Sequence, residues 1–124
     1  RSRNGVLLMP SQHRRHRGYE SQRIVATYLR ENGWPFAEPT GAGRQGTDCT
    51  GTPGIDWEVK ARRNLDLTGT LQQQRDRVPD GIIPIAVIRP DGYGSHRIAQ
   101  WPALVSLDVL VRLLHDAGYG DPNP

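Results

Sequence analysis

The sequence predicts a single small α/β domain, and three observations predict it. Apolar residues spaced four apart precede Gly33, as along one side of a helix. Residues 55–62 alternate apolar and charged side chains, which is the period of a strand with one face in water. Residues 82–88 are almost continuously apolar, which is typical of a strand buried on both faces. The length of 124 residues suits one domain of this layered kind.

The first element that the sequence predicts is a helix over residues 12–32. Val25 and Leu29 form an i, i+4 apolar pair on it, and Gly33 is suited to end it. Residues 1–11 lie before this helix and are predicted to form a flexible N-terminal arm. The single domain is therefore expected to span 12–119.

Glu20 lies on this helix, one turn before Ile24 and so at the edge of the apolar stripe. A carboxylate near a buried stripe needs a partner, because burying a free charge is costly. Glu20 is therefore a candidate for pointing into a functional site, and an ordinary solvated glutamate is the alternative.

Glycine and proline punctuate residues 36–54, so loops are expected there with a short strand at 47–50. The run Thr50-Gly-Thr-Pro-Gly54 predicts a hairpin connection into the alternating strand that follows. The later elements are a helix from about residue 68 to 78, a central strand over 82–88, an edge strand within 97–105, a helix from Ser106 to Gly118 and a disordered tail over 120–124.

The composition contains one unusual count. Of the 16 Lys and Arg residues, Lys60 is the only lysine, and the net charge is +3. Lysine is a compact point charge whereas arginine is a wide planar fork, so a site beside a metal or a water distinguishes them. Drift at a surface position is the other explanation. The lone Cys49 excludes an intramolecular disulfide and a cysteine-based zinc site.

The chemistry-bearing residues gather around the alternating strand. Glu58 and Lys60 are two apart and share one face, and Asp48 lies on the preceding strand of the predicted hairpin. Two carboxylates, helped by the Val59 carbonyl, suit a hard Mg²⁺ ion, with Mn²⁺ as a substitute. Asp56 also lies on the Glu58 face and therefore competes with Asp48 for the ligand role. A slip of one residue in the hairpin register would turn Asp48 to the opposite face and leave Asp56 as the ligand. A plain surface salt bridge between Glu58 and Lys60 is the alternative.

These residues resemble the PD-(D/E)xK nuclease superfamily. The resemblance rests on Gly-Thr-Asp48, the later Glu58-Val-Lys60 and the upstream helix with Glu20, and it extends through Arg89-Pro-Asp-Gly-Tyr-Gly. Within the superfamily, the chain is most similar to Holliday junction resolvase-like proteins of actinobacterial phages, over about residues 17–119. Thr47 stands where the superfamily's name has a proline.

The resemblance implies a restriction-endonuclease-like fold, with a central mixed β-sheet flanked by α-helices. It implies that Asp48 and Glu58 are metal ligands, that Lys60 is the catalytic lysine, and that Glu20 supports a second metal or orients the first. In several branches a glutamine on the following helix joins the site, and Gln73 is the best match among Gln72, Gln73 and Gln74.

The function expected from this resemblance is a metal-dependent DNA endonuclease that is structure-selective on branched DNA. Alternatives are a nuclease for flaps, nicks or single strands, and a catalytically silent nucleic-acid-binding module. Symmetric cutting implies a homodimer. Without a predicted membrane span or signal peptide, we expect a cytoplasmic protein of a bacterium or a phage-infected cell. Phosphate contacts are expected from basic side chains, namely Arg14, Arg15, Arg17, Arg62, Arg63, Arg75 and Arg77.

Overall fold

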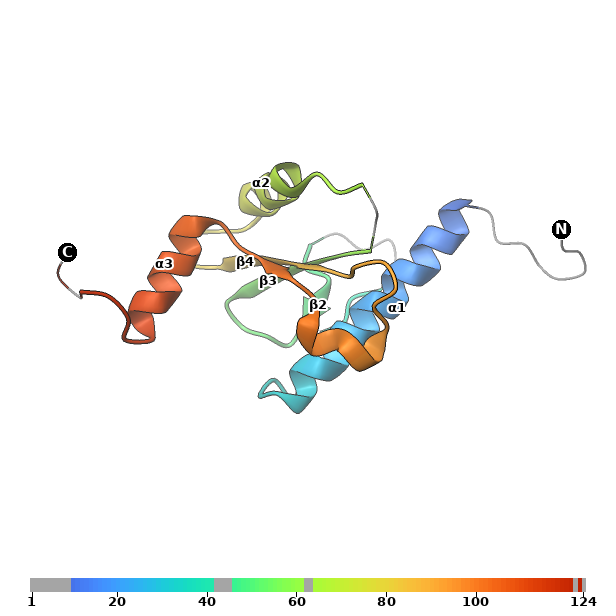
Figure 1. The fold of residues 1–124 in the computed structure, drawn as a ribbon, viewed down its shortest axis with the longest axis horizontal. Helices are drawn as coiled ribbons and strands as arrows, with labels where there is room; N and C mark the ends of the chain where they lie inside the picture. Colours follow the sequence, from blue (N-terminus) through green and yellow to red (C-terminus); the bar gives the residue numbers. More distant parts are fainter. Residues whose placement is uncertain (1–9, 42–45, 62–63, 122, 124) are drawn as a thin grey trace, which may run out of the picture.

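The computed structural model describes residues 10–41, 46–61, 64–121 and 123, and it is a mixed α/β structure (Figure 1). Side chains are described from Arg17 onward. The elements in chain order are α1 (Pro10–Glu31), β1 (Glu38–Pro39), β2 (Cys49–Thr50), β3 (Ile55–Lys60), α2 (Leu67–Arg77), β4 (Ile83–Ile88), a 3₁₀ helix η1 (Ser95–Gln100), β5 (Ala103–Leu104) and α3 (Leu107–Asp116).

The main sheet has three strands in the order β3-β4-β5. β3 and β4 run parallel and are connected through α2, while β5 pairs antiparallel with the other edge of β4. A parallel pair requires such a crossover, because a tight turn can join only antiparallel strands. The predicted central strand over 82–88 is confirmed as β4, which has a neighbour on each side.

β1 and β2 form a separate antiparallel pair beside the main sheet. Asp48, directly before β2, donates its backbone N–H to the Trp57 carbonyl at 2.7 Å. Gly51 makes the turn after β2 with φ +81°, a conformation that glycine adopts without a steric penalty. The hairpin predicted between residues 47–50 and 55–62 is therefore not formed as a paired ladder, because β2 pairs with β1 and β3 pairs with β4. The Asp48–Trp57 backbone bond joins the two segments instead.

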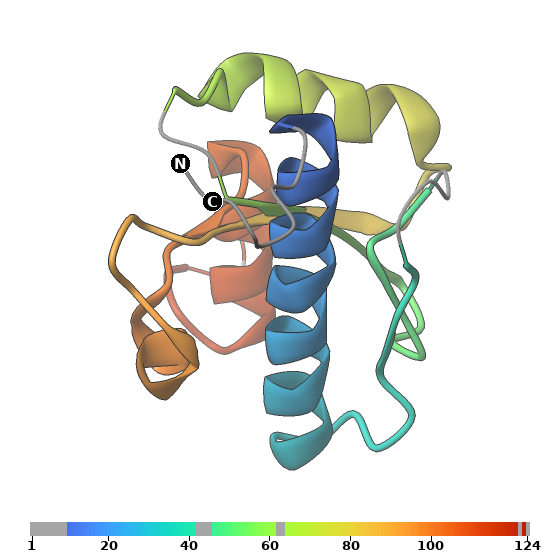
Figure 2. The ribbon, with the colours of Figure 1, turned by 90° about the vertical axis from the view of Figure 1, so that its right-hand side faces the viewer.

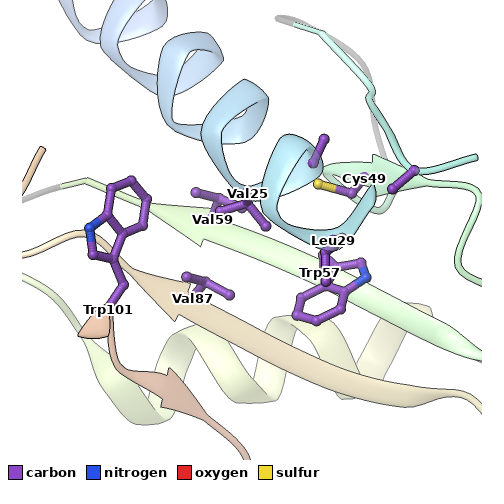
Figure 3. Packing of buried hydrophobic residues seen from close by; sticks show 9 residues of the cluster. Val25, Leu29, Cys49, Trp57, Val59, Val87 and Trp101 are labelled. Carbon is purple, nitrogen blue, oxygen red and sulfur yellow. The ribbon is translucent and has the colours of Figure 1, made fainter. Parts of the chain in front are cut away.

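The helices α1 and α2 cover opposite faces of the main sheet (Figures 1 and 2). On the α1 side, Val25 and Leu29 pack against Trp57 and Val59 of β3 (Figure 3). Val87, Trp101, Cys49 and the small residues Ala26 and Ala37 complete this cluster. The apolar core thus lies between α1 and the sheet.

The interface of α2 with the sheet is polar instead. Its buried residues are Thr70 and Gln74, and Asp66 caps its first turn by accepting a hydrogen bond from the Gly69 N–H at 3.0 Å. The sparse apolar residues of this segment reflect the fact that its partner, the charged face of β3, is polar.

Two predicted boundaries change in particular. α1 begins at Pro10, so residues 10–11 are helical rather than part of an arm, and residues 1–9 lie outside the described residues. The edge strand expected within 97–105 shrinks to Ala103–Leu104, because Pro102 lacks the N–H that a ladder needs and the chain before it forms η1. Of the tail predicted to be disordered, residues 122 and 124 lie outside the described part of the chain.

No helix in the described part of the chain is long and apolar enough to cross a membrane.

Candidate active site

The charged face of β3 carries the candidate site. Trp57 and Val59 point into the core against α1, so Asp56, Glu58 and Lys60 emerge on the opposite face, which α2 covers. The alternation that the sequence predicts is therefore confirmed on this strand, but its charged face does not lie in water as expected, since α2 covers it and Asp56 is 7% exposed. It separates an apolar core from a row of ionisable groups.

Asp48 reaches this strand from the neighbouring edge. Its carboxylate Oδ2 accepts a hydrogen bond from the Val59 N–H at 2.7 Å. The Thr47 hydroxyl holds the same edge in register by accepting the Trp57 N–H at 2.8 Å. These two contacts fix the Asp48 carboxylate beside the middle of β3, where the sequence placed it.

The Val59 carbonyl lies on the same edge as the Asp48 carboxylate. The carbonyls of Gly54 and Lys60 accept hydrogen bonds from Ile83 and Arg89 on the β4 side, at 2.8 Å each. Carbonyls of successive residues in a strand point to opposite edges, so those of Trp57 and Val59 point away from β4. The Asp48 N–H does bond to the Trp57 carbonyl. A third oxygen donor is thus available near Asp48.

Glu58 is held between two cations. Its Oε2 lies 3.2 Å from Lys60 Nζ, and its Oε1 lies 2.9 Å from a terminal nitrogen of Arg77.

Burial raises the pKa of Asp48 to about 6. The hydrogen bond from Val59 opposes this rise, and the negative charge of Glu58 reinforces it. Asp48 and Glu58 are therefore close enough to feel each other's charge.

Asp56 is already occupied by protein donors. Arg77 binds both of its oxygens, with Nη2 2.6 Å from Oδ1 and Nε 3.2 Å from Oδ2. The fully buried Gln74 adds a bond from Nε2 to Oδ1 at 3.1 Å. Of the two aspartates left open by the sequence, Asp48 thus keeps the more available carboxylate, and Asp56 serves to anchor Arg77.

An open cleft of about 890 Å³ runs over Asp48, Asp56 and Glu58, whereas Lys60 is not one of the residues that line it. Its charged and polar lining comprises Thr47, Asp48, Asp56, Glu58, Gln73 and Arg77. Gln73 is the glutamine that reaches this cleft, since Gln74 is buried and Gln72 bonds to Asp76 at 2.8 Å. Across the residues with described positions, no three His, Cys, Asp or Glu side chains cluster closely enough to hold a metal.

Glu20 lies elsewhere. Its Oε1 is 2.7 Å from Arg89 Nη1, and it borders a separate pocket between α1 and η1 that also includes Arg23 and Ile98. Arg89 in turn stacks on Trp101, with its guanidinium carbon 5.2 Å from the ring centroid. The structure therefore does not bring Glu20 together with Asp48 and Glu58.

The predicted phosphate-binding arginines have varied surroundings. Arg17 lies 3.6 Å from Asp91, Arg75 lies 2.7 Å from Asp108, and Arg77 is engaged by Asp56 and Glu58. Arg62 and Arg63 lie outside the described residues, as do the side chains of Arg14 and Arg15. The role of these seven arginines in binding DNA stays a prediction.

Sequence reasoning missed the structural role of Arg77 and Gln74. Both lie on the side of α2 that faces β3, one helical turn apart, and Thr70 continues this side one turn earlier. The available signal was this spacing of polar residues on a helix with few apolar ones. Their partner Asp56 is 18 and 21 residues away in the chain.

Comparison with protein-family models, with curated proteins and with solved structures finds no match to this chain. The functional conclusion therefore depends on the residues and their arrangement.

Proposed function

We propose that this protein is a metal-dependent DNA endonuclease that hydrolyses phosphodiester bonds in the β3 cleft. The observation that carries the proposal is the approach of Asp48 to Glu58 and Lys60. The Asp48 carboxylate bonds to the Val59 N–H at 2.7 Å, and Lys60 Nζ lies 3.2 Å from Glu58. This is the arrangement of two acids and a lysine that the resemblance to PD-(D/E)xK nucleases implies.

The donor set fits Mg²⁺ or Mn²⁺. The Asp48 and Glu58 carboxylates and the Val59 carbonyl are hard oxygen donors, and Mg²⁺ is commonly bound by one or two carboxylates while it keeps several waters. Three acidic ligands are therefore not required. When bound, such an ion supplies a nucleophile near neutral pH and stabilises negative charge on the phosphate.

The charge of the cleft supports metal dependence independently. Among the described residues, Asp48, Asp56 and Glu58 line it and Arg77 is the one lining cation. A phosphate that enters meets net negative charge, which repels it unless a further cation is present. The two positive charges of a divalent ion held by Asp48 and Glu58 would cancel this excess.

Lys60 and Arg77 have different roles in this proposal. The compact Lys60 ammonium, released from Glu58, positions the attacking water or stabilises the charge that develops on the phosphate. Arg77 orients the Glu58 carboxylate while it is anchored by Asp56. Gln73 lines the cleft and is available to the substrate. Glu20 is left out of the ligand set, since it pairs with Arg89.

The arrangement of elements also supports the proposal. A mixed sheet with α1 on one face and α2 on the other is compatible with the restriction-endonuclease-like architecture that the resemblance implies. The same resemblance favours branched DNA, such as a four-way junction, as the substrate.

Cleavage assays test this function. With Mg²⁺ or Mn²⁺, the purified protein is expected to cut four-way junctions, and Asp48→Asn, Glu58→Gln and Lys60→Ala should each lower the rate by about 100-fold or more. Asp80→Asn, which changes an exposed carboxylate outside the cleft, is the matched control and should cut normally. Intact substrates with wild-type protein, or undiminished cutting by Lys60→Ala, would overturn the proposal.

Mapping the products identifies the preferred substrate. Paired symmetric cuts near the centre of a junction indicate a resolvase. Cuts at the base of a flap or along single strands, with intact junctions, indicate the alternative nuclease.

A catalytically silent nucleic-acid-binding module is the second candidate, and one observation favours it. Both oxygens of Glu58 are paired with cations, Lys60 and Arg77, so the charge of Glu58 is compensated without a metal. This candidate predicts DNA binding that weakens steeply with salt, no cleavage and no binding of divalent ions.

A further inference from the structure

Arg77 bridges two carboxylates of the cleft. Its Nε and Nη2 atoms bind the two oxygens of Asp56, at 3.2 and 2.6 Å. Its Nη1 atom lies 2.9 Å from Oε1 of Glu58. Carboxylates that share one face repel each other unless a cation lies between them. In this protein the cation is a guanidinium group that belongs to the chain itself.

The Arg77 guanidinium is fixed in this position. Asp56 is buried, and it also accepts a hydrogen bond from the fully buried Gln74 at 3.1 Å. A bidentate pair between arginine and a carboxylate constrains the geometry of both groups, and arginine keeps its charge at every working pH. An ion from solution would have to displace both contacts of Arg77 with Asp56 before it could bind this carboxylate.

The remaining carboxylates of the cleft suffice for one divalent ion. With Asp56 committed to Arg77, the two that are left are Asp48 and Glu58, and their charges balance those of a single divalent ion. Glu20, which the resemblance implied for a second metal, borders a different pocket. Among the residues with described positions, the cleft therefore offers no further carboxylate to a second ion.

We propose that Arg77 takes the place of a second metal ion, so that the β3 cleft binds one divalent ion and presents one guanidinium beside it. This inference rests on the proposed function and deepens it. Arginine has five N–H donors, and the contacts with Asp56 and Glu58 use three of them. Arg77 lines the cleft, so the other two can donate to oxygens of a substrate phosphate. Charged donors of this kind stabilise the negative charge of a phosphate.

Titration with Mn²⁺ at pH 7.5 counts the ions that the wild-type protein binds. Electron paramagnetic resonance detects free Mn²⁺ and so gives the number bound, which we expect to be one per chain. Two ions per chain would overturn this inference and leave the proposed function standing. A chain that binds no Mn²⁺ would refute the proposed function and this inference with it. The titration uses the unaltered chain, so its result does not depend on the folding of a variant.

Removal of Arg77 tests whether it excludes a second ion. Arg77→Met releases Asp56 and one oxygen of Glu58, so this variant should bind two Mn²⁺ ions per chain. The double variant Arg77→Met with Asp56→Asn lacks the released charge and should bind one ion again. Arg75→Met, which removes an exposed arginine from the same helix, is the matched control and should bind one ion.

Circular dichroism checks that each variant is folded before it is titrated. A folded Arg77→Met variant that binds a single ion would overturn the proposal, because the released carboxylates would then not form a second site. A double variant that binds two ions would overturn it as well, since the extra ion would not depend on Asp56.

Discussion

Asp48 occupies a position that is unfavourable for a carboxylate unless a cation joins it. Burial is the largest cause that raises its pKa from 3.8 to about 6. The folded protein therefore holds this proton more tightly than the unfolded chain, so the shift lowers stability above pH 6. The penalty shrinks as the pH falls through 6 and disappears below 3.8, the ordinary pKa of the group, where both states are protonated. Such a penalty is common at functional sites, where activity and stability compete.

We predict that Asp48→Asn stabilises the metal-free protein near pH 7.5. The amide oxygen of the asparagine keeps the hydrogen bond from the Val59 N–H, and the substitution removes the buried charge. The gain is about 3 kcal/mol, since the pKa rises from 3.8 to about 6 and one pKa unit corresponds to about 1.4 kcal/mol. Urea unfolding in the presence of a chelator should show the gain at pH 7.5 and little of it at pH 4. A destabilised variant, or a gain that does not change with pH, would contradict this account.

Arg77 connects α2 to β3 on the face of the sheet opposite the apolar core. It bonds to Asp56, whose side chain is 9% exposed, and to Glu58. Removal of one partner of a buried ion pair leaves the other charge uncompensated, which is more costly than the pair itself is stabilising. The position of α2 over the cleft therefore depends on these carboxylates.

Arg77→Met is predicted to lower the free energy of unfolding by about 3 kcal/mol. The second change Asp56→Asn should restore most of this loss, because it removes the unpaired charge. Arg75→Met breaks the exposed pair with Asp108 and should cost much less, because exposed ion pairs contribute little to stability. Chemical denaturation measures all three variants. Equal losses for Arg75→Met and Arg77→Met would show that Arg77 does not anchor α2.

The turn between β2 and β3 depends on one glycine for steric reasons. Gly51 has φ +81°, and a Cβ there would overlap the Phe36 carbonyl oxygen. Gly54 has φ +84° but open space around it. We predict that Gly51→Ala costs at least about 2 kcal/mol, whereas Gly54→Ala costs about 1 kcal/mol from backbone strain alone. Thermal unfolding distinguishes them, and similar midpoints for the two variants would contradict the proposed overlap.

The elements with a strong local pattern could be predicted from the sequence. The alternation over 55–62 and the apolar run over 82–88 correspond to β3 and β4, because burial on one face or both determines which side chains a strand accepts. η1 was missed, since the stretch before Pro102 has too few apolar residues to set a period. The polar packing of α2 also escaped, because its partners are distant in sequence.

At the scale of the whole molecule, the sheet separates two environments. Its α1 side holds the apolar core around Trp57 and Val59 (Figure 3). Its α2 side holds the ionised groups and the cleft. The sequence predicted Asp48, Glu58 and Lys60 on one site because strand geometry links them locally. It could not predict that Arg77 would pair with Glu58 or that Glu20 would pair with Arg89, since tertiary packing decides both.

The central claim is that Asp48 and Glu58 hold a divalent ion, and calorimetric titration with Mn²⁺ tests it most directly. At pH 7.5, the wild-type protein and the surface control Asp80→Asn should both bind Mn²⁺ at the same site. Asp48→Asn and Glu58→Gln should lose that binding while remaining folded by circular dichroism. Absence of binding by the wild-type protein, or unchanged affinity in Asp48→Asn, would contradict the account.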